Sequence, residues 1–377
     1  MKRLNAYRMR LVLVGVVAVV ALGSGRVKAD FTFGEPVNLG PTVNSVYSDC
    51  WVCISSDGLE LYFGSDRPGS LGPNDIWVAR RASVSDPWEP PMNPGPPLNT
   101  PGGRNFLCCL SDDDLELYLV SYNRLGGYGS YDLWVTRRET KDHDWQQPTN
   151  LGSTINGSSY DDAACISHDG LELYFCSDRP GGIGSFDIWV STRATKNDSW
   201  GEAINLGAVI NSSARDACPC LSADGRLLLF SGIDLRAPYR PGGFGSDDMW
   251  MTIRQTVFDA WDTPVNLGSV VNSSSGEEEP RLSADGSILY FSSNRSGGYG
   301  GQWGDIWQAS IIPIVDFNGD RIVDAEDMCI MVDHWGEDYP LCDIGPMPWG
   351  DGVVDVEDLI VLAEHLFEEL PGRPIQP

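Results

Sequence analysis

The side chains with the clearest chemistry lie near the C-terminal end of the sequence. Five of them have the spacing of positions 1, 3, 5, 9 and 12 of a calcium-binding loop: Asp316, Asn318, Asp320, Asp324 and Asp327. The Ile322 carbonyl is available at position 7, and Arg321 replaces the glycine that is usual at position 6. Because Ca²⁺ is a hard cation that binds several oxygen ligands, this spacing predicts a Ca²⁺ site. The alternative is an acidic, capped helix that binds no metal.

A second stretch repeats part of this pattern. Asp351, Asp355 and Asp358 match positions 5, 9 and 12, and the Val353 carbonyl is available at position 7. The residues at positions 1 and 3 offer no carboxylate, so Asp343 can occupy position 1 only if residues 345–348 form an insertion. A second Ca²⁺ site therefore depends on that insertion.

A short helix is expected after each of these loops. The two helical segments cover residues 328–335 and 359–370. Cys329 lies in the first segment and Cys342 lies ahead of the second loop, so a disulfide between them could link the first helix to the second loop.

A further set of candidate residues recurs along the central part of the chain. An acid, or Asn in one copy, stands six residues before a Ser that opens a turn: Asp49, Asn105, Asp161, Asp216 and Glu277. An arginine followed by glycine-rich sequence accompanies each copy: Arg67, Arg124, Arg179, Arg240 and Arg295.

The acids of this set could catalyse glycoside cleavage. Glycosidases use two carboxylates, which lie about 5–5.5 Å apart in retaining and about 6.5–9.5 Å apart in inverting enzymes. The candidate catalytic residues for such a reaction are Asp49, Asp161, Asp216 and Glu277. Their near-symmetry gives no visible difference between an acid and a base. The structural alternative is an acid–arginine pair that stabilises every copy.

These acids belong to a repeat that must position them. An Asp-apolar-Trp motif recurs with spacings of 57, 55, 61 and 57 residues and begins at Asp75, Asp132, Asp187, Asp248 and Asp305. A Ser-x-Asp-Gly turn precedes four of the motifs, and Asp-Gly between strand-like runs is a strong hairpin signal. A segment with a second tryptophan and two asparagines follows each of the first four motifs, whereas its fifth copy stands at the N-terminus around Asn38 and Asn44. The N-terminal strand is therefore expected to complete the last repeat.

The repeats resemble the WD40-like, TolB-type (PD40) propeller repeat, whose SxDGxxLYFxSxRxGGxGxxDIW pattern they follow over residues 30 to 312. The resemblance implies an all-β propeller of five four-stranded blades, with the N-terminal strand closing the last blade. In that strand order, the acids and arginines described above share one rim around the central channel.

The two loop–helix halves near the C-terminus resemble a type I dockerin over residues 314–370. This resemblance implies a small α-helical, Ca²⁺-stabilised module. It also implies a cohesin-like partner, of the kind found in extracellular assemblies that degrade polysaccharides.

Departures from the repeat mark further candidates. Tyr239 and Arg240 lie in a lengthened loop of the fourth repeat and Trp303 lies in the corresponding loop of the fifth, where they could bind a glycan or a protein. The run Glu277-Glu278-Glu279 is interpreted as a solvated turn, with cation binding as the alternative. Cysteines recur two residues before the turn serine, at Cys53, Cys109, Cys165 and Cys220, where small buried side chains or disulfides would both fit.

The N-terminal residues 1–29 have the pattern of a secretory signal peptide, with basic residues ahead of the apolar run Leu11 to Leu22. Twelve apolar residues are fewer than the roughly 20 that a membrane-spanning helix needs. Without the six Lys and Arg of this segment, 20 basic residues face 53 acidic ones, a net charge of −33. This excess of acids argues against nucleic acid and anionic membranes as partners.

The sequence therefore predicts a signal peptide over 1–29, a propeller over 30–313, a dockerin-like module over 314–370 and a tail over 371–377. The protein is expected to be secreted, extracellular or attached to the cell surface, with the periplasm as the alternative. The first functional hypothesis is an exported, non-catalytic binding or scaffold propeller that joins an extracellular assembly. The second is a carbohydrate-active propeller, a glycoside hydrolase or lyase, that uses acids at the channel rim.

Overall fold

The computed structural model describes residues 31–122, 124–233, 240–301, 304–313, 315–318, 322–337, 342–345 and 353–367. The predicted signal peptide and the tail over 371–377 lie outside these residues. No helix within the described ranges is both long enough and apolar enough to cross a membrane.

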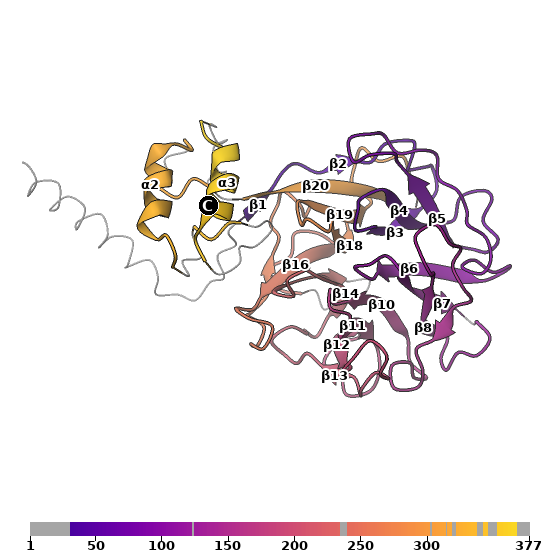
Figure 1. Cartoon of the computed structure of the whole chain (residues 1–377). Helices are drawn as coiled ribbons and strands as arrows, with labels where there is room; N and C mark the ends of the chain where they lie inside the picture. The colour runs from indigo at the N-terminus through magenta and orange to yellow at the C-terminus, as the bar shows by residue number, and fades with distance from the viewer. Residues whose placement is uncertain are drawn as a thin grey trace, which may run out of the picture.

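Five antiparallel sheets are arranged as the blades of a propeller (Figure 1). The inner strands are β3 (Asp49–Ile54), β6 (Arg104–Leu110), β10 (Asp161–Ile166), β14 (Arg215–Leu221) and β18 (Glu277–Leu282). The second strands are β4 (Glu60–Ser65), β7 (Glu116–Tyr122), β11 (Glu172–Ser177), β15 (Leu227–Ile233) and β19 (Ile288–Ser293). The third strands are β5 (Asp75–Arg80), β8 (Tyr131–Arg137), β12 (Asp187–Thr192), β16 (Asp247–Ile253) and β20 (Asp305–Pro313). The prediction of an all-β, five-bladed propeller is confirmed.

The outermost strands are short, and the N-terminal segment supplies one of them. Blades 2 to 4 end in β9 (Thr149–Asn150), β13 (Ile204–Asn205) and β17 (Val265–Asn266), while in blade 1 Met92 forms a single bridge to Val78. Both β1 (Phe31–Phe33) and β2 (Val37–Asn38) pair with β20. The first and last parts of the propeller are therefore joined in one sheet, as expected from the displaced fifth segment.

The residues repeated in every blade stabilise the blade itself. In blade 1, Asp75 accepts hydrogen bonds from the Leu71 amide (2.6 Å) and from Asn93 (2.8 Å). Asn99 in turn pairs with both the N–H and the C=O of Ile76. The same contacts recur at Asp132, Asp187, Asp248 and Asp305. The Asp-apolar-Trp motif therefore has a structural role in each blade.

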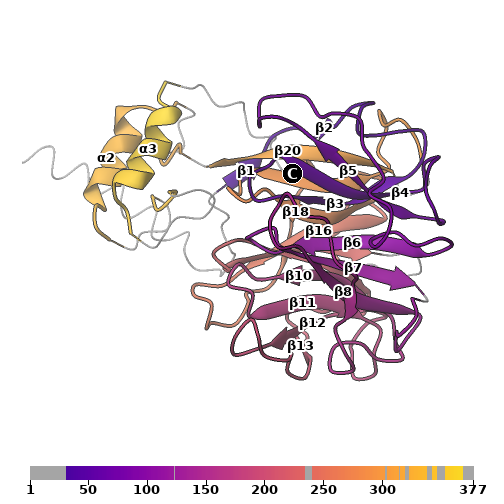
Figure 2. The same cartoon turned by 45° about the vertical axis from the view of Figure 1, so that its right-hand side comes forward.

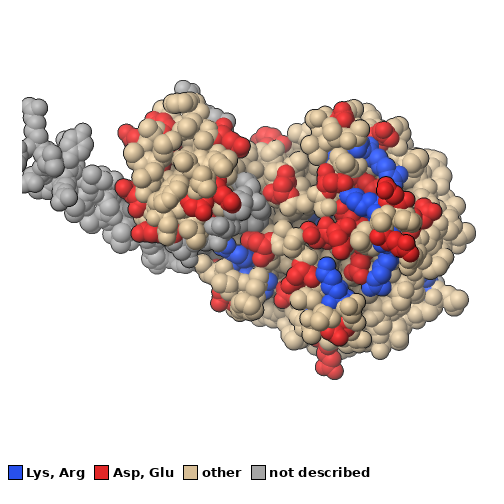
Figure 3. Space-filling model, viewed as in Figure 1, with Lys and Arg blue, Asp and Glu red and all other residues tan. Residues whose placement is uncertain are grey.

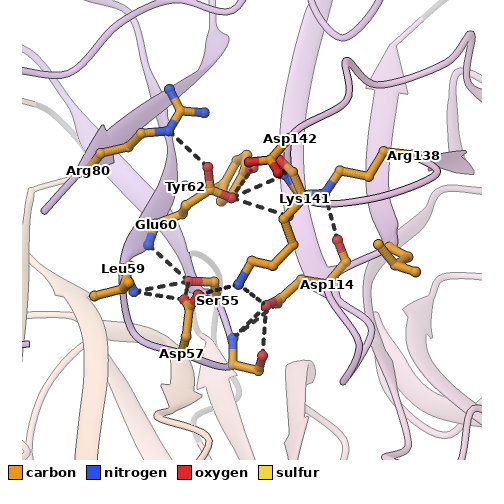
Figure 4. Close-up of polar contacts among 12 residues, drawn as sticks. Ser55, Asp57, Leu59, Glu60, Tyr62, Arg80, Asp114, Arg138, Lys141 and Asp142 are labelled. Carbon is orange, nitrogen blue, oxygen red and sulfur yellow. Dashed lines mark hydrogen bonds and ion pairs between the residues drawn. The ribbon is translucent and has the colours of Figure 1, made fainter. Parts of the chain in front are cut away.

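Charged residues on the rim that carries the Ser-x-Asp turns join neighbouring blades (Figure 4). Glu60 of blade 1 accepts from Arg80 (2.9 Å) in its own blade and from Arg138 (3.2 Å) of blade 2. Lys141 of blade 2 binds Asp114 (2.8 Å) and also pairs with Asp57 of blade 1. In Figure 3, likewise, basic side chains lie among acidic ones on the propeller face turned to the viewer. Pairing across the blade boundary stabilises the ring.

Each inner strand contains a β-bulge about two residues after its first acid or Asn. In four blades the bulge residue has a positive φ: Trp51 (58°), Ala163 (51°), Cys218 (54°) and Glu279 (62°). A bulge changes the direction of the neighbouring side chains and is frequent next to active sites. The side chains before and after the bulge therefore face different surroundings.

The C-terminal part holds two short helices, α2 (Ala325–Asp333) and α3 (Val356–Glu364), which lie beside the end of β20 (Figures 1 and 2). Both begin about three residues earlier than the sequence pattern predicted, because Asp324 and Asp355 form capping boxes at their N-termini. A small apolar core that includes Val323, Met331 and Leu362 packs between them.

Candidate functional site

The predicted catalytic acids lie at one rim of the propeller, which we call the acid rim: the N-terminal ends of β3, β6, β10, β14 and β18. Asp49 is fully buried. One of its oxygens pairs with Arg67 and accepts from Ser65 (2.7 Å), and the other accepts from the Ser45 amide (2.5 Å) and hydroxyl (2.8 Å). Both oxygens are therefore engaged within the blade.

The other three acids have equivalent surroundings. Asp161, Asp216 and Glu277 are fully buried and pair with Arg179 (2.5 Å), Arg240 (2.6 Å) and Arg295 (3.0 Å). Burial raises the pKa of Asp161 and Asp216, and the arginines oppose this rise. In blade 2, Asn105 makes the same contact with Ser121 (2.8 Å) without a charge. This arrangement matches the acid–arginine pair that stabilises each blade and does not bring these acids together around one substrate position.

A different group of carboxylates lies just beyond these acids. Asp162 and Glu278 directly follow Asp161 and Glu277, at a position that holds Cys50, Phe106 and Ala217 in the other blades. Glu279 occupies the bulge of β18, and Asp247 begins β16. We call Asp162, Asp247, Glu278 and Glu279 the acid cluster. Its members come from blades 3, 4 and 5 and are not repeated around the ring.

Glu279 is the enclosed member of the acid cluster, with 5% of its surface exposed. It accepts hydrogen bonds from the Trp51 amide (2.5 Å) and the Ser292 hydroxyl (2.6 Å), and its own amide donates to Ser231 (3.0 Å). Burial raises the pKa of Glu279 to about 7, although these hydrogen bonds oppose the rise. Glu279 therefore changes charge near neutral pH but is closed to a substrate by its neighbours.

Glu278 is only partly buried and faces two other acids. It shares a hydrogen bond with Asp247. Burial, followed by the charges of Glu279 and Asp247, raises the pKa of Glu278 to about 8, and Arg215 opposes this rise. Glu278 is therefore largely protonated at neutral pH.

Asp162 and Arg215 complete this part of the acid rim. Burial raises the pKa of Asp162, and the positive charge of Arg215 opposes the rise and favours the ionised carboxylate. The guanidinium of Arg215 lies 4.6 Å from the ring centre of Phe186. Its Nε is buried and has no hydrogen-bond partner among the described residues.

Aromatic side chains extend from Phe186 across blades 1 to 3. Ring centres are 6.2 Å apart between Phe186 and Tyr160, and 5.1 Å apart between Tyr160 and Tyr131. We call the whole set the aromatic arc: Trp51, Phe106, Tyr122, Tyr131, Tyr160 and Phe186. Tyr122 and Tyr160 are 40% and 41% exposed. The arc meets the acid cluster where Arg215 stacks on Phe186.

Most of this site lies outside the residues that the repeat pattern predicts. Asp162, Asp247 and Arg215 were not predicted, and the interpretation of Glu277 to Glu279 as a solvated turn was wrong. The three glutamates begin β18, and Glu277 and Glu279 are buried. The available signal was the departure from the repeat, because two blades carry an acid where the others carry Cys, Phe or Ala.

Of the three ligand candidates in the lengthened loops, only Arg240 lies among the described residues. Arg240 pairs with Asp216 and stacks on Trp250 at 4.9 Å, so its charge is engaged in the blade. Tyr239 and Trp303 lie outside the described residues.

The candidate calcium ligands lie in two equivalent halves. Asp327 accepts hydrogen bonds from the amides of Phe317 (2.7 Å), Asn318 (3.2 Å) and Asp324 (2.9 Å). In the second half, Asp358 accepts from the amides of Ile344 (2.6 Å), Gly345 (2.7 Å) and Asp355 (2.6 Å). Asp343 therefore stands before Ile344 as Asp316 stands before Phe317, which is the position that the insertion would give it.

The donor chemistry of these halves suits a hard cation, because it consists of carboxylate, amide and carbonyl oxygens. The described candidates are Asp316, Asn318, Ile322, Asp324, Asp327, Asp343, Val353, Asp355 and Asp358, while Asp320 and Asp351 lie outside the described residues. Cys329 is exposed and Cys342 is buried, and both are free thiols in this structure.

No protein-family model and no curated protein matches the chain. Among solved structures, the chain is similar to TolB from Acinetobacter baumannii, with 15% identity and a TM-score of 0.44 over 71% of this chain and 52% of that one. It is also similar to an α-L-arabinofuranosidase from Podospora anserina, with 13% identity and a TM-score of 0.49 over 76% and 100% of the two chains. An α-L-arabinanase from Penicillium chrysogenum is similar too, with 12% identity and a TM-score of 0.43 over 76% of this chain and 99% of that one. The chain thus spans about half the length of that TolB.

Proposed function

We propose that the propeller is a carbohydrate-active enzyme, a glycoside hydrolase that cleaves its substrate at the acid cluster. The observation that carries this proposal is the meeting of unrepeated carboxylates from blades 3, 4 and 5 with Arg215, at one end of the aromatic arc. The acids repeated in every blade have structural partners and are left out of the mechanism.

The surroundings of Glu278 and Asp162 divide the roles of acid and base. Glu278 is largely protonated at neutral pH, because its pKa is about 8, so it can donate a proton to the glycosidic oxygen. Burial raises the pKa of Asp162, and the charge of Arg215 opposes this rise and favours the ionised form. An ionised Asp162 can activate water or attack the sugar carbon. Asp162 and Glu278 both interact with Arg215 but differ in their preferred charge state, and the rim acids lack such a difference.

Glu279 acts on Glu278 rather than on the substrate. Its carboxylate is enclosed by Trp51 and Ser292, and its charge helps to raise the pKa of Glu278. We therefore assign it as a positioning residue that adjusts the acid.

The aromatic arc supplies the binding surface. Tyrosine and tryptophan rings stack on the apolar faces of sugars, and their polar atoms bind hydroxyl groups. A non-catalytic glycan-binding propeller is the second candidate, since the aromatic arc alone would suffice for binding.

The decisive experiment measures reducing ends released from a panel of neutral plant polysaccharides by the purified chain. Glu278→Gln and Asp162→Asn should abolish release, whereas Asp86→Asn, an exposed control on the opposite rim, should not. Binding without release from any substrate would support the non-catalytic candidate instead.

We also propose that the C-terminal helix pair binds Ca²⁺ and docks the enzyme onto a cohesin-like module outside the cell. The repeated arrangement of Asp327 and Asp358 supports a duplicated module. The predicted leader over 1–29 agrees with export, and a pull-down with cohesin modules in the presence and absence of a chelator tests the partner. Failure of a cohesin panel to bind with Ca²⁺ present would contradict the docking role.

A further inference from the structure

Four cysteines and one arginine surround the channel axis below the acid cluster. Each stands two residues before a turn serine on an inner strand: Cys53, Cys109, Cys165, Cys220 and Arg281. All five are 3% to 5% exposed. Burial lowers the pKa of the Arg281 guanidinium, but the four surrounding thiols outweigh burial and raise it. The thiols therefore converge on one buried cation.

Two of these cysteines are in contact with each other. The Cys220 thiol donates a hydrogen bond to the sulfur of Cys165, and the Leu221 amide donates to the same sulfur at 3.3 Å. Their strands, β10 and β14, belong to adjacent blades and pack together. Both are free thiols in this structure, and their hydrogen bond shows that the two sulfurs on neighbouring strands are within reach of each other.

We propose that Cys165 and Cys220 form a disulfide that joins blade 3 to blade 4 at the channel axis. The sulfur of Cys165 is the nucleophile, since it receives two hydrogen bonds and lies near Arg281.

The thiol chemistry of Cys165 agrees with this role. The hydrogen bond from Cys220 lowers the pKa of Cys165 to about 7, although burial opposes it, and Arg281 and the Leu221 amide add to the decrease. A thiol with a pKa near the ambient pH is the most effective in exchange.

The oxidant is a low-molecular-weight disulfide such as oxidised glutathione. The Cys165 thiolate attacks one sulfur of that disulfide, breaks its S–S bond and releases one thiolate. The Cys220 thiol then loses its proton and attacks the Cys165 sulfur, which forms the new S–S bond and releases the second thiolate. Two electrons and two protons pass from the cysteines to the two glutathione thiols. Because both cysteines are buried in the closed ring, this exchange takes place while the ring closes, after β10 and β14 have packed together.

The disulfide would fix the spacing of two strands that carry site residues. β10 carries Asp162 three residues before Cys165, and β14 carries Arg215 five residues before Cys220. This consequence rests on the proposed function, whereas the disulfide itself does not.

A second thiol pair links the same two blades and must be separated from the first. The Cys218 amide donates to the sulfur of Cys176, and the Cys176 thiol donates to the Asp162 carbonyl at 3.4 Å. Trypsin leaves Cys165 and Cys176 in one peptide and Cys218 and Cys220 in another, because no Lys or Arg lies between them. Fragmentation of the linked peptide must therefore assign the pair.

The test begins with the full chain folded in the presence of oxidised glutathione. The remaining free thiols are then alkylated, and a peptide map is recorded without reduction. The expected result is one linked peptide whose fragments join Cys165 to Cys220. The link should persist in Cys176→Ala/Cys218→Ala and disappear in Cys165→Ser/Cys220→Ser. Alkylation of both Cys165 and Cys220, with or without a link between Cys176 and Cys218, would overturn the proposal.

Thermal unfolding gives a second measurement that does not depend on activity. Reduction should lower the melting temperature of the wild type by roughly 5 °C. Reduction should lower the melting temperature of Cys53→Ser by the same amount, because this variant lacks another thiol around Arg281 but keeps the disulfide. Reduction should leave the melting temperature of Cys165→Ser/Cys220→Ser unchanged. An equal decrease in the double variant would contradict the assignment. If that variant does not fold, the peptide map of the wild type still decides the pair.

Discussion

Glu277 and Glu278 are adjacent in β18, but their carboxylates have opposite surroundings. Glu277 is fully buried against Arg295 (3.0 Å), Ser273 (2.6 Å) and Ser293 (2.9 Å). Glu278 is partly exposed and faces Asp247 and Arg215. Successive residues of a strand point to opposite sides, and the bulge that follows changes the direction further. The first glutamate therefore stabilises the blade, and the second is available for chemistry.

Replacing Glu278 with Gln should remove the proton donor and leave the fold intact. We expect kcat/KM on a natural polysaccharide to fall by about 10²–10⁴-fold, the usual size of general acid catalysis. An aryl glycoside whose leaving group needs no proton should lose much less. Equal losses on both substrates would argue against Glu278 as the acid.

The pH dependence of kcat/KM should follow the protonation of Glu278. Activity requires the protonated acid, so it should decline as the pH rises through about 8, the pKa of Glu278. Glu279→Gln removes a negative charge that raises this pKa, so the alkaline limb should shift to lower pH. An unchanged limb in Glu279→Gln, with Asp86→Asn as the control, would contradict the proposed influence of Glu279.

The rim acids should affect stability more than catalysis. Asp49→Ala leaves Arg67 buried without its partner and should lower the free energy of unfolding by about 3 kcal/mol. Asp49→Asn should cost less, since Asn105 is the natural residue at this place in blade 2. Urea unfolding measures both variants. A large loss of kcat in Asp49→Asn at unchanged stability would contradict this prediction and would indicate that the rim acids take part in catalysis.

The aromatic arc should contribute to substrate binding. Tyr160→Ala removes a ring that is 41% exposed and lies between Tyr131 and Phe186. We expect KM, or the Kd of a catalytically inactive variant, to rise about 5- to 10-fold, which corresponds to roughly 1 kcal/mol. Tyr299→Ala is a matched control, because Tyr299 is 45% exposed and lies outside the arc. Equal effects of the two substitutions would rule out a specific platform.

The C-terminal halves should each bind one Ca²⁺ if Asp343 serves as Asp316 does. Calorimetric titration of the wild type should then give two sites, and Asp316→Ala and Asp343→Ala should each remove one. Glu364→Gln, at the end of α3, should remove neither. A single site that is unaffected by Asp343→Ala would show that the second loop does not use this residue.

The sequence contained enough information for the propeller because the blade is built from local, repeated features. Turn residues such as Asp57-Gly58, and paired asparagines such as Asn93 and Asn99, recur at a nearly constant spacing. Local hydrogen bonds dictate these positions, so the pattern predicts the strands. The displacement of one segment to the N-terminus likewise predicted the closure of the last blade by β1 and β2.

The site could not be predicted in the same way. A run of glutamates such as Glu277 to Glu279 usually marks a solvated surface, and nothing in the local sequence indicates that a bulge separates them or that Trp51 and Ser292 enclose the last one. Asp162, Arg215 and Glu278 are far apart in the chain and meet only because three inner strands converge on the channel.

The sequence by itself determined the number of blades, the way the ring closes and the two acidic loops ahead of the C-terminal helices. The tertiary structure alone decided which acids are engaged in ion pairs and hydrogen bonds within the blades and which are available for chemistry. The physical reason is that burial, the direction of a side chain after a bulge and the charges on neighbouring blades set the state of a carboxylate. These quantities depend on residues that are distant in the sequence.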